Sequence, residues 1–562
     1  MDTKAVCAPF CPTFSTREIA MHKEQVKKLQ MRMVKAVQEQ RYNKVKALQW
    51  LLTHSYSAKV LAVHKVTTNK GKITPGVDGV TWKSLEQKQT AVKSLKRRGY
   101  KASPLRRIYI PKKNGKLRPL SIPVMVDRAM QALYLMTLDP IAETIMDYGT
   151  YGFRKKRSTA DAIEAIFKAT ASNADCAEWI LEGDIKSCFD KISHEWLLNN
   201  IPIDKRMLSE WLKSGFIFEE RFNATTEGAA QGGIISPCIA GLALNGLGSQ
   251  LEKRIKRVRY ENGGYINTKL HTIVYADDFV VTGRSRELLE TEVLPVIVEF
   301  LAERGLELSI EKTKITNIHE GFDFLGQNIR KYKNKVLIKP SKSNVKNFLN
   351  RIRKVIFGHK MVKQEELIDI LNPKIRGWTN YHRHVVSKEI FSYVDFRIYS
   401  WIWKWCKRRH NKKGKWWISE KYFHSEGSRN WIFQTITKDK GTVRLLRASD
   451  TKIIRHKKIQ QEANPYAVEW QSYFEEREGE RMFEGMSGRK RLNKIWLKQR
   501  GRCTLCAEDV GVRTGWRTHF NIKGKTEIVH PKCHQKLHPE LKMNRRFQPR
   551  KVEAYDCLSV MR

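Results

Sequence analysis

The sequence predicts a multidomain α/β protein with a small metal-binding module near its C-terminus. Its 562 residues exceed what one hydrophobic core normally organises, which indicates three to five modules. Short β-branched runs, such as residues 273–274 and 279–281, alternate with stretches of helical periodicity. Cys503, Cys506 and Cys533 cluster late in the chain, whereas the other seven cysteines are scattered. This distribution indicates a metal site rather than a disulfide framework.

The charge of the chain points to a polyanionic partner. Lysine and arginine number 105 against 58 acidic residues, which gives a net charge of +47. Such an excess is self-repulsive unless a polyanion neutralises it, and nucleic acid does so through phosphate contacts. A basic, solvated surface is the plain alternative. Because no apolar run of transmembrane length or signal peptide is recognisable, we expect a bacterial cytoplasmic protein, nucleoid-associated or in a ribonucleoprotein, without a membrane partner.

The sequence up to residue 123 predicts basic helices followed by a hairpin. From residue 17 to 61 the pattern is helical, and either an RNA-binding face or a solvated pair of amphipathic helices explains it. Two β-rich runs between residues 105 and 123 enclose an Asn-Gly pair, which is a strong hairpin signal. Lys112 and Arg118 lie near the two ends of that hairpin. A charged surface ribbon and a triphosphate-binding hairpin both remain open for this segment.

Three aspartates follow predicted strands. The buried run 179–184 ends in Asp184, and the run 273–281 reads as a hairpin with Asp277 and Asp278 at its tip. Two carboxylates about 5 Å apart repel by roughly 3 kcal/mol at an effective dielectric near 20. A divalent cation would turn this cost into binding energy, and magnesium suits carboxylates that share it with water and phosphates. An acidic turn without a metal is the alternative reading.

The order of these segments resembles the blocks of reverse transcriptases. The blocks are the basic hairpin, the strand ending in Asp184, the loop Gln231-Gly232-Gly233, Tyr275-Ala276-Asp277-Asp278, Leu308-Ser309-Ile310-Glu311-Lys312-Thr313 and Phe322-Asp323-Phe324-Leu325-Gly326. Each block alone is weakly diagnostic, but the ordered set across residues 70–330 is specific. The resemblance implies RNA-directed DNA polymerase activity on a right-hand fold of fingers and palm.

The resemblance also assigns roles to individual residues. Asp184 and Asp277 look like the ligands of two Mg²⁺ ions, and Asp278 is the second catalytic acid of its motif. Phe189 falls where these enzymes place the aromatic gate that crowds the ribose 2′-oxygen; an ordinary core phenylalanine is the alternative. By the same resemblance, Lys112 and Arg118 would contact the triphosphate of the incoming dNTP. Gln231 would line the nucleotide pocket.

The region after the polymerase blocks resembles the thumb and maturase region of group II intron-encoded proteins. Residues 372–382 lead into an apolar stripe at helical spacing, formed by Phe391, Val394, Ile398, Trp401 and Trp405. The family implies binding of the group II intron RNA, assistance to its splicing, and copying of that RNA after insertion into target DNA. A retron or defence-associated reverse transcriptase, and a splicing factor with a vestigial polymerase, are the alternatives. No pattern predicts an oligomeric state.

The C-terminal segment predicts a zinc module with a departure from its family. Cys503 and Cys506, with His530 and Cys533, have the spacing of a tetrahedral structural Zn²⁺ site. His519, His534 and His538 suggest a second metal site, and together these residues resemble an HNH endonuclease with its ββα-metal fold. HNH sites commonly present a His-His or Asp-His pair, but here the pair reads either Thr518-His519 or His519-Phe520, depending on register, and is one ligand or one general base short in both. Phenylalanine cannot accept a proton, so we predict weak or absent DNA cleavage.

These inferences divide the chain into five parts. We expect an N-terminal helical, RNA-binding extension of the fingers (1–85), fingers and palm (86–335), a helical thumb or maturase domain (336–415), a small DNA-binding module (416–484) and an HNH-like zinc domain (485–562).

Overall fold

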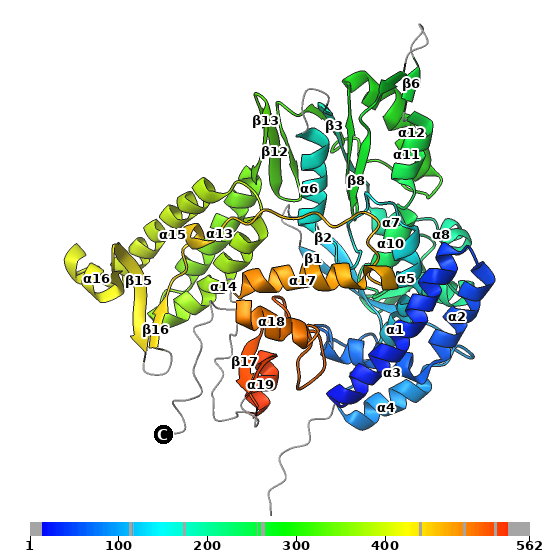
Figure 1. Cartoon of the computed structure of the whole chain (residues 1–562), viewed down its shortest axis with the longest axis horizontal. Coiled ribbons are helices and arrows are strands. Elements are labelled where there is room, and N and C mark those ends of the chain that lie inside the picture. Colours follow the sequence, from blue (N-terminus) through cyan, green and yellow to red (C-terminus); the bar gives the residue numbers. More distant parts are fainter. Residues whose placement is uncertain are drawn as a thin grey trace, which may run out of the picture.

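The computed structural model describes residues 14–111, 115, 117–171, 176–255, 257–259, 265–437, 441–486, 490–521 and 525–537. A bundle of basic helices forms the N-terminal part, and it packs on the long buried helix of the fingers (Figure 1). The predicted helical stretch 17–61 forms three helices, because the chain turns at Gln40, whose φ is 55°, and at the extended Ser55. The bundle comprises α1 (Thr16–Gln38), α2 (Tyr42–His54), α3 (Tyr56–Thr68) and α4 (Leu85–Ser94).

The fingers contain the predicted hairpin. Strands β1 (Leu105–Pro111) and β2 (Leu117–Ile122) pair antiparallel, with Ile110 opposite Arg118. Strands β4 (Phe216–Phe218) and β5 (Arg221–Asn223) extend the sheet in the order β2-β1-β4-β5. Helix α5 (Met125–Ile145) follows the hairpin and is buried over most of its length.

The palm is a four-stranded sheet that is buried on both faces. Its order is β10-β3-β9-β8, from Lys314–Asn317, Trp179–Asp184, Asp278–Gly283 and His271–Tyr275. Along β3, Ile180 packs into one hydrophobic cluster and Leu181 into another, and in β9 Val280 and Val281 divide in the same way. This alternation explains why the sequence shows continuous apolar runs here rather than polar-apolar alternation.

Short helices and two small sheets surround the palm. Helix α6 (Thr159–Thr170) covers the face that carries Ile180 and Val280. The other helices are α7 (Cys188–Lys191), α8 (His194–Asn200), α9 (Lys205–Leu212), α10 (Ser236–Ala243), α11 (Leu247–Ile255), the π-helix η1 (Leu288–Val293) and α12 (Leu294–Ala302). The small sheets pair β6 (Arg257–Arg259) with β7 (Tyr265–Asn267), and β11 (Phe322–Phe324) with β12 (Gln327–Tyr332) and β13 (Lys335–Pro340).

The thumb is a three-helix unit that extends further than the sequence boundary suggested. It contains α13 (Lys342–Gly358), α14 (Gln364–His382) and α15 (Lys388–Arg409). Their core continues into Tyr422, Phe433 and Val443, so the following segment packs on the thumb as part of the same core. That segment comprises α16 (Lys415–Tyr422), β14 (Phe423–Glu426), β15 (Arg429–Thr437), β16 (Gly441–Arg444) and the 3-10 turn η2 (Ala448–Asp450). The first part of the expected module 416–484 thus shares the thumb core, and the module itself stays a prediction.

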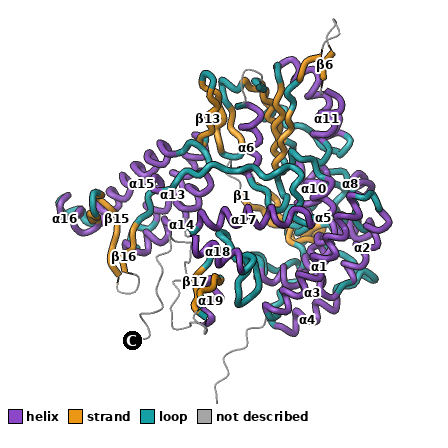
Figure 2. The backbone as a smooth tube through the Cα atoms, viewed as in Figure 1, coloured by secondary structure: helices purple, strands orange, loops and turns teal. Residues whose placement is uncertain are grey.

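A strap without helix or strand, residues 451–467, crosses from the thumb over the palm (Figures 1 and 2). Asp161 of α6 accepts hydrogen bonds from the Ile459 amide at 2.8 Å and from His456 Nε2 at 2.8 Å. The strap leads through η3 (Val468–Trp470) into α17 (Gln471–Gly485) and α18 (Lys490–Lys498). The chain then forms a ββα unit of β17 (Arg517–Phe520), β18 (Thr526–Val529) and α19 (Pro531–Leu537).

Candidate functional site: a carboxylate cluster in the palm and a Cys3His cluster

The palm sheet brings the three predicted aspartates together. Strands β3 and β9 are antiparallel neighbours, and their register pairs Asp184 with Asp278. Strands β8 and β9 form the predicted hairpin, in which Ala276 and Asp277 make a two-residue turn. Ala276 has a φ of 60°, the positive value that tight hairpin turns require at a central position. Residues separated by more than 90 positions thus share one edge of the sheet.

The loop at residues 149–152, which follows α5, packs against this turn. The Tyr151 amide donates to the Val274 carbonyl at 2.8 Å, and the Val274 amide donates to the Gly149 carbonyl at 2.9 Å. Gly152 follows directly, and a Cβ atom on it would lie 2.1 Å from the Ala276 nitrogen. Only glycine permits so close an approach of two backbones. The position of Asp277 therefore depends on this loop.

The carboxylates repel one another and are partly balanced by one lysine. Desolvation, and then the charges of Asp277 and Asp184, raise the pKa of Asp278 to about 6. Lys312 Nζ donates to Asp184 Oδ2 at 2.6 Å, and this hydrogen bond and the three carboxylate charges raise the pKa of the lysine. Crowded carboxylates such as these are a donor set that a hard divalent cation stabilises.

The predicted nucleotide-binding residues lie on neighbouring elements where the structure describes them. Phe189 lies on α7, half-buried, and its ring meets Phe153 edge to face at 6.1 Å between centroids. Gln231 donates through its side chain to Asp190 Oδ2 at 3.3 Å, and its carbonyl accepts from the Ser121 amide of β2 at 2.7 Å. The Gly-rich loop is thereby connected to the fingers hairpin.

Of the two basic residues predicted to bind the triphosphate from that hairpin, the structure describes one. Arg118 is exposed on β2, at the position opposite Ile110. Lys112 lies outside the described residues. Their contact with a triphosphate stays a prediction.

The apolar stripe of the thumb forms part of the hydrophobic core. Its five residues Phe391, Val394, Ile398, Trp401 and Trp405 are all buried in the thumb cluster. Basic residues of the same helix, Lys404 and Lys407 among them, are exposed. The helix thus separates an apolar packing face from a basic outer face, as the spacing predicted.

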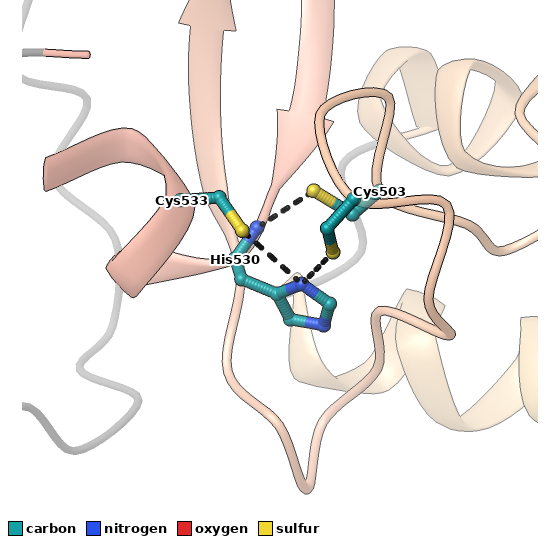
Figure 3. Close-up of side chains that lie close together, drawn as sticks. Cys503, His530 and Cys533 are labelled. Carbon is teal, nitrogen blue, oxygen red and sulfur yellow. Dashed lines mark hydrogen bonds between the residues drawn. The ribbon is translucent and has the colours of Figure 1, made fainter. Parts of the chain in front are cut away.

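The C-terminal cysteines converge as their spacing predicted. Cys503, Cys506, His530 and Cys533 each offer a ligand atom, and these atoms all lie within 4.8 Å of one another. His530 Nδ1 is 3.2 Å from Cys506 Sγ and 3.9 Å from Cys533 Sγ, and the His530 amide faces Cys503 Sγ (Figure 3). His530 Nε2 lies 3.0 Å from the Asp509 carbonyl. This contact leaves Nδ1 toward the thiols, as in metal-binding histidines whose other nitrogen is hydrogen-bonded.

The second histidine cluster is described in part. The rings of His519 on β17 and His534 on α19 lie 5.7 Å apart. His538 lies outside the described residues. In the strand register His519 is opposite Glu527 and Phe520 is opposite Thr526. The unit runs strand, strand, helix, whereas an HNH-like domain and a metal bound by these histidines stay predictions.

Two residues near the carboxylates were not given roles by sequence reasoning. Lys312 stands in the Leu-Ser-x-Glu-Lys-Thr block, and its position there was a usable signal. Phe153 stands in the basic loop 151–158, where nothing in the sequence indicates that its ring meets Phe189. This pair depends on a contact between residues of two separate elements.

Comparisons with known proteins agree with this arrangement. The family described as Reverse transcriptase (RNA-dependent DNA polymerase) matches residues 110–329, the N-terminal domain of reverse transcriptase matches 18–95, and the group II intron maturase-specific domain matches 345–423. Among the described residues, no helix is both long and apolar enough to span a bilayer.

Relatives extend the match across these parts. Protein YkfC of Escherichia coli strain K12 is 35% identical over 301 residues, which cover 47% of this chain and 77% of YkfC. Group II intron-encoded protein LtrA of Lactococcus lactis subsp. cremoris is 28% identical over 411 residues, covering 57% of this chain and 68% of LtrA. An uncharacterised 91 kDa protein of the Schizosaccharomyces pombe cob intron is 28% identical over 60% of this chain and 51% of its own length. The chain belongs to the group II intron reverse transcriptase and maturase family, and it joins an RNA-directed DNA polymerase to a splicing maturase domain.

Proposed function

We propose that Asp184, Asp277 and Asp278 form the magnesium-dependent centre at which this polymerase copies intron RNA into DNA. The register that pairs Asp184 with Asp278 is the observation that carries the proposal. Asp184 and Asp277 would hold two Mg²⁺ ions, and Asp278 would complete the acidic edge. Bound Mg²⁺ would lower the pKa of the attacking 3′-hydroxyl and neutralise charge on the leaving diphosphate.

The surrounding side chains position the nucleotide in this proposal. The half-buried ring of Phe189, five residues after Asp184, excludes a ribose 2′-hydroxyl. Gln231 supports the nucleotide from the loop that is hydrogen-bonded to β2. Lys112 and Arg118 neutralise the charge of the triphosphate.

The rest of the chain binds nucleic acid. The N-terminal helices and the basic outer face of the thumb bind the group II intron RNA, whose phosphates balance much of the +47 charge. The segment after the thumb contacts target DNA during retrohoming. Its strands pack directly on the thumb core, which supports a continuous surface from the thumb to this segment.

The C-terminal unit is a zinc-stabilised domain in this proposal. Zn²⁺ is the ion that a Cys3His set selects, and four protein ligands make a closed, structural site. The HNH-like histidines lack a second imidazole at Phe520, so DNA cleavage by this domain is weak or absent.

A primer-extension assay on an RNA template tests the proposal. Asp277→Asn and Asp184→Asn keep the shape of the side chain and remove its charge, so we expect extension to fall by at least about 10³-fold. Asp323→Asn, an exposed aspartate on β11, is the matched control and should retain extension. Wild-type levels of extension by Asp277→Asn would refute the assignment.

A further inference from the structure

Lys312 is held at the carboxylate cluster by its own turn. The Ser309 amide donates to the Asp184 carbonyl at 2.8 Å, which attaches the turn to the end of β3. The amides of Lys312 and Thr313 both donate back to the Ser309 carbonyl, at 3.0 and 2.9 Å. The Thr313 hydroxyl donates to the same carbonyl at 2.9 Å. The backbone at Lys312 is therefore fixed relative to Asp184.

The side chain of Lys312 is far less constrained than its backbone. Its ammonium donates to Asp184 Oδ2 at 2.6 Å, yet 65% of the lysine side chain is exposed, against 23% for Asp184. An exposed lysine can rotate away at small cost, because such ion pairs contribute roughly 0.2–1 kcal/mol. The carboxylate that it leaves cannot move far, because β3 is paired on both sides.

The ammonium lies at one oxygen of a carboxylate that a metal ion would use. A carboxylate keeps further lone pairs for a cation, but a cation that binds Asp184 close to the ammonium is repelled by it. Three carboxylates share one edge of the sheet, and Lys312 donates a hydrogen bond to one of them, Asp184.

We propose that Lys312 is a tethered counter-ion that holds Asp184 in the metal-free enzyme and competes with the divalent cation for its carboxylate. This inference rests on the proposed function, because it takes Asp184 as a metal ligand. Metal binding displaces the ammonium from Oδ2, and the freed side chain then lies beside the site where the triphosphate arrives. Lys312 acts through Asp184 and is a positioning residue.

The neighbouring pair Lys186–Glu307 provides a matched control. Lys186 lies two residues after Asp184, and its ammonium is 3.3 Å from Glu307 rather than from the aspartates. The side chains of Lys186 and Glu307 are both exposed, at 68% and 74%. Lys186→Met therefore removes the same charge from the same neighbourhood without freeing an oxygen of Asp184.

Titration of the full-length protein with Mn²⁺ alone, followed by the electron paramagnetic resonance signal of free Mn²⁺, tests the proposal without nucleotide or turnover. We expect Lys312→Met to bind Mn²⁺ roughly two- to five-fold more tightly than the wild type. Lys186→Met should change this affinity by less than Lys312→Met does, and Lys312→Arg, which retains the cation, should restore wild-type affinity. Unchanged or weaker Mn²⁺ binding by Lys312→Met would overturn the proposal.

Two further measurements separate this inference from the proposed function. Asp184→Asn and Asp277→Asn should each lose the Mn²⁺ site; if they keep it, the metal assignment of the palm fails, and the Lys312 proposal with it. If they lose it while Lys312→Met binds as the wild type does, only the Lys312 proposal fails. In primer extension, the Mg²⁺ concentration that gives half-maximal rate should fall in Lys312→Met by the factor seen with Mn²⁺, and an unchanged requirement counts against competition.

Discussion

Gly152→Ala is expected to disable the polymerase by displacing the turn that carries Asp277. A Cβ atom at residue 152 would lie 2.1 Å from the Ala276 nitrogen and 2.9 Å from the Tyr275 carbonyl carbon, both backbone atoms. To restore an ordinary contact of 3.4 Å, the loop and the turn must separate by about 1.3 Å. A misplacement of roughly 1 Å at a reacting centre costs on the order of 10²-fold in rate. We therefore expect kcat to fall about 100-fold.

Single-nucleotide primer extension under saturating dNTP measures this loss, and thermal unfolding reports whether the variant remains folded. Gly358→Ala is the control, since no atom lies within 4 Å of a Cβ placed at this last position of α13. The control should extend primers at the wild-type rate. A folded Gly152→Ala protein with a kcat within about three-fold of the wild type would refute the coupling between this loop and the turn.

Four further predictions address other parts of the chain. Phe189→Ala should increase ribonucleotide incorporation relative to dNTP, because the ring no longer crowds the 2′-hydroxyl; an unchanged sugar preference in competition assays would remove the gate assignment. Cys506→Ser should lower the zinc content measured by mass spectrometry and destabilise the C-terminal unit, while primer extension continues; full zinc content in the variant would contradict the Cys3His site. Phe520→His should raise metal-dependent nicking of target DNA, by up to about 10²–10⁴-fold if the missing base is what limits cleavage; rapid nicking by the wild type that survives His519→Ala would disprove this reading. Burial raises the pKa of Asp161, but hydrogen bonds from His456, Ser158 and the Ile459 amide, together with the charge of His456, outweigh burial and hold it at about 2; because a lowered pKa adds stability above the unfolded value near 4 that is lost toward pH 2, the Tm difference between wild type and Asp161→Asn should shrink as the pH falls below 4, and a difference that grows below pH 4 would contradict the linkage.

Local patterns predicted much of the fold and of the candidate site. The hairpin at residues 105–122 follows from Asn-Gly between two β-rich runs, and the palm strands follow from short β-branched runs that end in acids. The Cys3His cluster followed from spacing alone, because two close pairs of ligands need only one turn each to face a common ion. The aromatic stripe of the thumb was predictable as core for the same reason, since helical spacing places those residues on one face.

Domain boundaries are harder to predict from sequence where segments far apart in the chain share one hydrophobic core. The segment after residue 415 packs on the thumb through Tyr422 and Phe433, and no local composition shows which core an aromatic residue joins. Asp161 is a further example. Its sequence position indicates an ordinary capping residue of α6, and its side chain does accept from the Ser158 amide at 2.9 Å. It also accepts hydrogen bonds from His456 and Ile459, about 300 positions later.

The chemistry of this protein could be recognised from residue order, because each block carries its own acids, turns or ligands within a few residues. Only the tertiary structure decided which of these groups act together. Strand pairing set Asp184 opposite Asp278, the approach of Gly152 set the position of the Asp277 turn, and the turn at Ser309 set Lys312 against Asp184. These contacts join residues far apart in the chain, and their geometry arises from the register and close packing of the folded sheet, which no local pattern contains.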